Sequence, residues 1–158
     1  MDLKKEGGRK IVLGTILSFD PFGAADSLVI DKGEKNGITA GDAVVLWGNV
    51  LVGRVKEAAE KESRVLLITS AQSRVTAVSE DDKAKGVVSG SASGALTLDL
   101  VLKEAQLNTG QILLTSGLDG AFRRGFLVGD VVKVSGNTSA PFQKASVRPF
   151  FKLRDLKQ

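Results

Sequence analysis

Glycine recurs so regularly between Val29 and Val55 that it limits what this segment can form. Gly33, Gly37 and Gly41 are spaced four residues apart. Helix and strand interiors disfavour so much glycine, whereas a backbone path that needs positive φ requires it. The flanking runs are rich in β-branched residues and bounded by Gly, Asn and Asp, so they predict strands. These runs are Leu28–Ile30, Ala43–Trp47 and Val50–Val55.

A two-residue turn is predicted between the last two of these strands. Gly48 and Asn49 separate two apolar runs, and both residue types tolerate the positive φ angles of a tight hairpin turn. The charged run Lys56–Glu62 lacks an apolar stripe and is too short to be stable as an isolated helix. We therefore interpret it as the end of a strand followed by a charged hairpin loop.

Strand patterns continue along the rest of the chain. In Ala95–Lys103 the four leucines at 96, 98, 100 and 102 alternate with other residues, which predicts a half-buried strand with all four leucines on one face. Eighteen glycines and three prolines in 158 residues fit an all-β fold with many turns. The other expected strands are Ile11–Phe19, Ser63–Thr69, Arg74–Val78, Ile112–Thr115, Val128–Val134 and Gln143–Arg148.

Two related β modules are suggested by a weak internal repeat. The spacing of glycine and apolar residues in 41–53 recurs in 110–129 with a longer insert, and such self-similarity is typical of repeated structural units. We expect a first module over 11–70 and a second over 71–150, with one strand open to exchange between them. Residues 151–158 are expected to form a basic C-terminal tail.

The absence of cysteine and histidine excludes much chemistry. No disulfide, thiol nucleophile or cysteine–zinc site can form, and a Ser–His–Asp triad lacks the imidazole that accepts the serine proton. Thr115-Ser116-Gly117 therefore does not predict such a protease, although a Ser–Lys variant stays open. Ser116–Gly120 lacks the Gly-Lys-Ser/Thr of a phosphate loop. We expect no catalytic residue, no cofactor and no metal site.

Carboxylates and arginines give little support for a glycosidase, a cation site or a nucleic-acid site. Asp31, Asp99 and Asp130 have no spacing that pairs them as a glycosidase requires. Glu80-Asp81-Asp82 lacks the glycine and Asn/Asp spacing of a calcium loop. Single-strand binders combine a basic groove with aromatic platforms. Here the net charge is +4, but the arginines at 54, 64 and 74 have no aromatic residues between them. A nucleic-acid-binding barrel stays open as an alternative.

An ordered set of motifs resembles one known family. The matching segments are Asp31-Lys32-Gly33, Asn36-Gly37-Ile38, Leu51–Val55, Ser63–Thr69, Ser73–Val75, Thr115–Phe122 and Gly125–Gly129. Together they resemble the extracytoplasmic β-barrel region of the rod-shape-determining MreC family, over roughly residues 28–150. The resemblance implies two small packed antiparallel β-barrels of about six strands each, joined by glycine-rich turns.

The resemblance also implies a role. Members of the family are expected to be non-enzymatic scaffolds that control cell shape, bind and activate the elongation-specific penicillin-binding transpeptidase, and self-associate as dimers or filaments. They are expected to act with MreD, RodA and MreB at the periplasmic or extracytoplasmic face of the cytoplasmic membrane. The implied N-terminal transmembrane anchor and coiled coil do not occur in this sequence. Residues 1–10 are therefore expected to be disordered or not native to the protein.

A scaffold of this kind would bind its partners through side chains on loops and barrel rims. Aromatic residues and arginine are enriched at protein interfaces, although a core role is equally open for several of these residues. Phe22 lies in a predicted type I turn formed by Asp20-Pro21-Phe22-Gly23. The candidate partner contacts are Phe22, Trp47, Phe122, Arg123, Arg124, Phe150 and Phe151. The expected structural turn glycines are Gly33, Gly37, Gly41, Gly48, Gly53, Gly117, Gly120 and Gly129.

Overall fold

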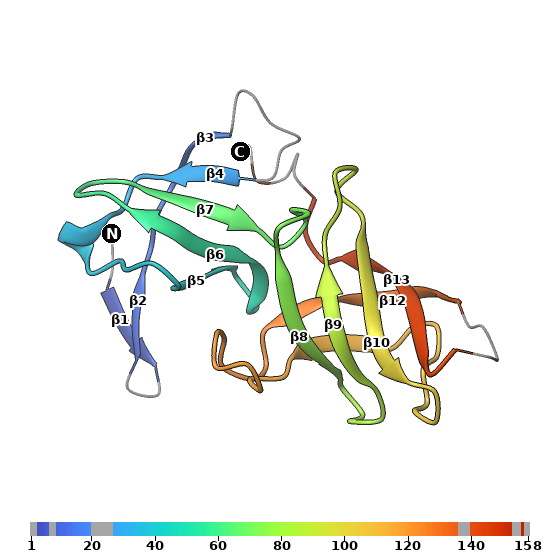
Figure 1. The fold of residues 1–158 in the computed structure, drawn as a ribbon. Helices are drawn as coiled ribbons and strands as arrows, with labels where there is room; N and C mark the ends of the chain where they lie inside the picture. The colour runs from blue at the N-terminus through green and yellow to red at the C-terminus, as the bar shows by residue number, and fades with distance from the viewer. Residues whose placement is uncertain (1–2, 7–8, 20–26, 136–139, 153–155, 157–158) are drawn as a thin grey trace.

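The computed structural model describes residues 3–6, 9–19, 27–135, 140–152 and 156. Within these residues it contains strands and one short 3-10 helix, η1 (Glu34–Asn36), which confirms the all-β prediction (Figure 1). The strands are β1 (Leu3–Glu6), β2 (Arg9–Val12), β3 (Ile16–Phe19), β4 (Ser27–Ile30), β5 (Ala43–Leu46), β6 (Val50–Ala58), β7 (Ser63–Leu67), β8 (Arg74–Ser79), β9 (Lys85–Ser89), β10 (Leu96–Leu102), β11 (Ile112–Thr115), β12 (Leu127–Ser135) and β13 (Phe142–Pro149).

Six of the strands close into a barrel. They follow the order β11-β8-β9-β10-β13-β12, and an additional β11–β12 pairing joins the two ends. Every neighbouring pair in this barrel is antiparallel. Closure gives each strand two partners, which removes exposed sheet edges. All six strands lie within 74–149, so the barrel is contiguous in sequence.

The first module is an antiparallel sheet in the order β3-β4-β7-β6-β5. Among the described residues the strand pairings of this sheet do not by themselves close it into a second barrel, which the family resemblance implied. A parallel contact between Leu127 of β12 and Val50 of β6 joins the module to the second barrel. The two modules lie side by side, with the start of β6 and the end of β7 nearest the barrel (Figure 1).

The N-terminal region differs from the sequence prediction. Residues 3–6 and 9–12 pair as the antiparallel strands β1 and β2, where a disordered or non-native segment was expected over residues 1–10. The single strand expected over Ile11–Phe19 is wrong, because the chain leaves the strand path at residues 13–15. At this break the Thr15 amide donates to Asp31 Oδ1 at 2.7 Å, and the Asp31 amide donates back to the Thr15 carbonyl at 3.0 Å. These bonds direct β3 onto β4 rather than onto β1.

One buried core runs through both modules. It includes Leu28, Leu51 and Leu67 from the first sheet and Val88 and Leu113 from the barrel. The C-terminal segment, expected as a basic tail, contributes two side chains to this core: Phe151 and Leu156. Burial of these large apolar side chains stabilises the packing of the C-terminal segment against the modules.

The expected turn glycines divide into two groups. Gly37 ends η1 with φ +85°, a left-handed conformation that glycine adopts without steric cost. Gly53 and Gly129 are not turn residues, since they lie inside β6 and β12. A Cβ at Gly53 would lie 2.1 Å from the Leu66 carbonyl oxygen of β7, so glycine there allows a close backbone approach. Positive φ also occurs at Gly41, Gly48, Gly117 and Gly120, whereas Gly33 is extended.

Candidate partner-binding surfaces

The β5–β6 hairpin presents the most exposed aromatic side chain of the described residues. Trp47 is 81% exposed, and its neighbours Val45 and Leu46 are also exposed. Gly48 and Asn49 form the turn with φ of +86° and +63°, as the hairpin prediction requires. The Asn49 carbonyl accepts a hydrogen bond from the Leu127 amide at 2.8 Å. The turn is therefore held against the start of β12, which fixes the surface that contains Trp47.

The β11–β12 loop, residues 116–126, connects this hairpin region to the outer wall of the barrel. Arg123 stacks over the Phe126 ring at 4.4 Å, and Arg124 forms an ion pair with Asp82 at 2.8 Å. Phe122 belongs to this loop, and its side chain is buried. The Thr115 hydroxyl donates to the Arg123 carbonyl at 2.6 Å and accepts from the Phe126 amide at 2.9 Å. The arginine side chains thus project from a loop with a defined backbone.

The remaining candidate aromatic residues differ in accessibility. Phe150 is 40% exposed beyond the end of β13, whereas Phe151 is buried in the core. In this structure Phe122 and Phe151 fill the interior and present little side chain to a partner. Phe22 lies outside the described residues. The surface accessible to a partner is therefore represented among the candidates by Trp47, Phe150 and the arginine pair.

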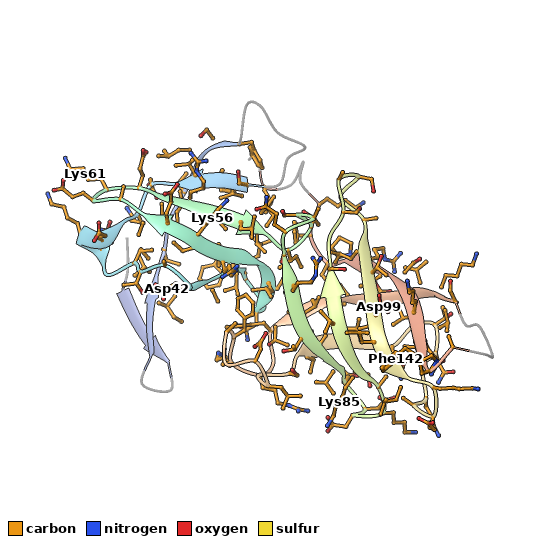
Figure 2. The ribbon with its side chains drawn as sticks, in the orientation of Figure 1. Asp42, Lys56, Lys61, Lys85, Asp99 and Phe142 are labelled. Carbon is orange, nitrogen blue, oxygen red and sulfur yellow. The ribbon has the colours of Figure 1, made fainter. Side chains whose placement is uncertain are left out.

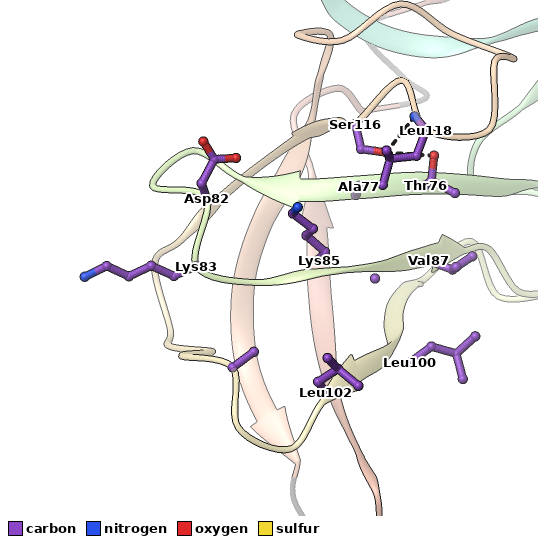
Figure 3. Close-up of a pocket in the computed structure, with 12 residues that line it drawn as sticks. Thr76, Ala77, Asp82, Lys83, Lys85, Val87, Leu100, Leu102, Ser116 and Leu118 are labelled. Atoms are coloured by element: carbon purple, nitrogen blue, oxygen red, sulfur yellow. Dashed lines mark hydrogen bonds between the residues drawn. The ribbon is translucent and has the colours of Figure 1, made fainter.

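A hollow of about 400 Å³ lies on the outer wall of the barrel, beside β8, β9 and the end of β10 (Figure 3). No sequence pattern indicated this groove. Leu100, Leu102 and Leu118 line it and are 53%, 59% and 74% exposed. The Ser116 hydroxyl donates to Thr76 Oγ1 at 2.9 Å and accepts from the Leu118 amide at 3.3 Å. These bonds attach the start of the β11–β12 loop to β8.

The leucine face predicted for β10 is wrong beyond Leu98. Leu96 and Leu98 are buried, but Leu100 and Leu102 are exposed, and Val101 takes the interior position. The register of β10 against β13 shifts between Leu98 and Val101, and Leu100 has φ +60°. Such a bulge adds one residue to the strand and exchanges its two faces. A pattern of alternating leucines contains no sign of the bulge.

The side chains considered for catalysis have other bonding partners. Asp31 accepts from the Thr15 amide, and Asp99 Oδ1 accepts from the Leu100 amide at 2.8 Å. Asp130 accepts from Nε and Nη2 of Arg148. These bonds belong to local turns and strand pairs rather than to a paired acid and base. In the part of the chain that the structure describes, no group of three Asp or Glu side chains could hold a metal ion.

The acidic run at residues 80–82 organises a turn. Asp81 accepts from the Ser79 hydroxyl at 2.6 Å and from the Lys83 amide at 3.1 Å. The hydrogen bond from Ser79, followed by the bond from the Lys83 amide, holds the pKa of Asp81 below its ordinary value of 3.8. Asp82 is the partner of Arg124. Both carboxylates thus stabilise the β8–β9 hairpin and its contact with the β11–β12 loop.

Comparison with known proteins identifies the family. The model of the barrel core of the rod shape-determining protein MreC matches residues 16–158. The chain belongs to the MreC family. The cell shape-determining protein MreC of Listeria monocytogenes is 31% identical over 147 residues, covering 90% of this chain and 50% of the relative. MreC of Escherichia coli is 34% identical over 142 residues, covering 87% of this chain and 37% of the relative.

Solved MreC structures share this fold. MreC from Pseudomonas aeruginosa superposes with a TM-score of 0.79 at 25% identity, covering 88% of this chain and 91% of that structure. The MreC chain in a complex of PBP2 and MreC from Helicobacter pylori gives a TM-score of 0.72 at 18% identity, covering 91% and 90% of the two chains. The chain spans half or less of the two curated relatives described above. Among the described residues no helix is long and apolar enough to cross a membrane.

Proposed function

We propose that this chain is the barrel region of a non-enzymatic cell-shape scaffold that binds the elongation-specific penicillin-binding transpeptidase. Membership of the family supports the role in cell shape. The complex of PBP2 with MreC from Helicobacter pylori supports a penicillin-binding protein as the partner, since that MreC chain has the same fold. The scaffold acts at the extracytoplasmic face of the cytoplasmic membrane, held by an N-terminal anchor.

Trp47 is the observation on which the proposed binding surface rests. Tryptophan is among the residues that contribute most to protein interfaces, and a monomer gains nothing from leaving 81% of this side chain exposed to water. The two preceding residues of β5, Val45 and Leu46, are also partly exposed apolar side chains. Contiguous exposed apolar patches mark interaction sites. The hairpin is also fixed by the hydrogen bond between Asn49 and Leu127, so it loses little conformational freedom on binding.

Activation of the transpeptidase requires more than contact. A bound scaffold shifts an enzyme toward its active conformation only if it binds that conformation more tightly than the inactive one. The chain would supply this differential binding energy and no catalytic group. In the same assembly we place MreD, RodA and the MreB filaments, as the resemblance implies.

Self-association is a second proposed activity. One solved structure with the same fold is described as the major periplasmic domain from the cell shape-determining filament MreC. In the described part of this chain β5 pairs with β6 alone, so its other edge is unpaired. An unpaired strand edge can pair with a strand of another chain. A dimer or filament could therefore form by strand pairing between copies.

Titration of this chain with the extracytoplasmic domain of the same organism's elongation transpeptidase tests the proposal. We expect saturable binding by calorimetry, and we expect Trp47→Ala to weaken it by about tenfold or more. Leu17→Ala is the matched control, because Leu17 is a 55% exposed apolar residue on β3. Absence of binding for both the monomer and a version fused to a dimeric coiled coil would contradict the transpeptidase assignment.

A further inference from the structure

The outer-wall groove combines exposed leucines with a positive charge. Leu100 and Leu102 reach it from β10, and Leu118 reaches it from the β11–β12 loop. In Figure 3 Lys85 extends from β9 toward β8, while Lys83 points away from the groove. Leu118 is 74% exposed although a leucine contributes to stability mainly when it is buried. The groove therefore presents an unburied apolar surface next to a lysine.

The backbone of β10 holds Leu100 in this surface under strain. Leu100 has φ +60°, a left-handed conformation that is a marked outlier for a bulky residue. The bond from the Leu100 amide to Asp99 Oδ1 at 2.8 Å fixes the bulge. Glycine would adopt this conformation without strain. Strained residues of this kind concentrate at binding sites, where the surrounding structure maintains them.

The positive charge of Lys85 is not paired with a carboxylate among the described residues. Asp82 lines the same groove, but its carboxylate is bound by Arg124 at 2.8 Å. A ligand carboxylate could therefore approach Lys85 without displacing an existing partner. Charge complementarity of this kind directs association and excludes partners of the wrong sign.

We propose that the outer-wall groove binds an apolar segment of the transpeptidase that includes a carboxylate. The apolar side chains would pack on Leu100, Leu102 and Leu118, and the carboxylate would pair with Lys85. This inference rests on the proposed function and assigns it a second contact region. An anionic membrane surface fits less well, because it would cover the whole adjacent hairpin and meet the exposed Glu80, whereas a single ligand carboxylate approaches Lys85 alone.

One partner can cover both the groove and the Trp47 hairpin. The β11–β12 loop begins at Ser116 and Leu118, which line the groove. After the loop ends, Leu127 bonds to Asn49 in the turn next to Trp47. The loop thus connects the two exposed apolar regions through a backbone that is hydrogen-bonded at both ends. A footprint across both modules would let one bound partner fix their relative position.

Calorimetric titration with the extracytoplasmic transpeptidase domain tests the groove directly. We expect Lys85→Glu, Leu118→Ala and Leu100→Gly each to weaken binding by about fivefold to tenfold. Lys61→Glu makes the same change of charge at the tip of the β6–β7 hairpin, at the opposite end of the molecule from Lys85 in Figure 2, and should bind like the wild type. Leu118→Ala is chosen because its exposed side chain can be removed without disturbing the core.

The outcomes separate the inference from the proposed function. Failure of the wild-type chain to bind, both alone and fused to a dimeric coiled coil, would overturn both. Wild-type binding that Trp47→Ala weakens, but that all three groove variants leave unchanged, would overturn the groove alone. Equal losses for Lys85→Glu and Lys61→Glu would show a general charge effect and would also overturn it. A last experiment measures sedimentation of the wild type and the groove variants with phosphatidylglycerol vesicles. If the groove variants lose binding to the vesicles but not to the transpeptidase, the groove binds membrane instead and the inference is overturned.

Discussion

Substitution of Gly37 separates backbone strain from packing in this fold. Gly37 has φ +85° and ψ 15° at the end of η1, and a Cβ added there would meet no atom within 4 Å. Gly37→Ala should therefore lower the free energy of unfolding only by the cost of holding alanine in a left-handed conformation, roughly 1–2 kcal/mol. Gly37→Val should cost more, because a β-branched residue tolerates this region worst. Gly37→Asn should cost less than Gly37→Ala, because asparagine is favoured in this conformation.

Gly53 supplies the contrasting case, in which space rather than conformation is limiting. A Cβ there would lie 2.1 Å from the Leu66 carbonyl oxygen and 2.9 Å from its carbon. Both atoms are backbone, and Gly53 pairs with Leu67 in the β6–β7 ladder. The strands would have to separate to admit a methyl group. Overpacking costs typically about 1–3 kcal/mol and sometimes more, and we place Gly53→Ala at about 3 kcal/mol or above because no flexible side chain can yield.

Urea and thermal unfolding of the variants measure these differences. For a domain of this size about 1 kcal/mol corresponds to a change in Tm of roughly 2–4 °C. We expect Gly37→Ala to lower Tm by about 2–8 °C and Gly53→Ala to lower it further or to prevent folding. A Gly37→Ala variant as unstable as Gly53→Ala would refute the reasoning. So would equal Tm values for the Ala and Asn variants at position 37.

Two further predictions concern acid stability and the shared core. Because the pKa of Asp81 is lowered in the folded state, its contribution to stability is present above the pKa of the unfolded chain and is lost as pH falls through the lower folded pKa. Asp81→Asn should therefore show a smaller loss of Tm than the wild type when the pH is lowered below about 4; an identical pH profile would contradict this. Leu67→Ala should cost about 2–5 kcal/mol in urea unfolding, since Leu67 is fully buried in the core. The exposed Leu17→Ala should change stability by less than about 0.5 kcal/mol, and equal losses for the two would contradict the assigned core.

Local sequence patterns predicted most of the strands and the tight turn. The runs Ala43–Trp47, Val50–Val55 and Ser63–Thr69 coincide with β5, β6 and β7 to within a few residues. The Gly48-Asn49 turn has the positive φ angles that these residues favour. Such features depend on each residue and its nearest neighbours, so the sequence contains the information directly. The ordered family motifs were informative for the same reason, since they follow this pattern of strands and turns.

Features that depend on distant contacts escaped prediction. The bulge that exposes Leu100 depends on how β10 pairs with β13, more than 40 residues later in the chain. The interior positions of Phe122 and Phe151 depend on the packing of segments that lie far apart in sequence. Among the described residues the unpaired edge of β5 follows from the sheet order rather than from its own residues. Aromatic composition alone could not divide the candidate contacts into surface and core.

The sequence by itself determined that this chain is an all-β member of its family, without the imidazole or thiol on which common catalytic sites depend. Tertiary structure alone decided which apolar side chains remain on the surface. Trp47 is exposed at the hairpin turn that follows β5, Leu118 because its loop passes over the barrel, and Leu100 because a bulge exchanges the faces of β10. Burial is a property of the whole packed chain, and the proposed binding surfaces are the apolar residues that this packing leaves uncovered.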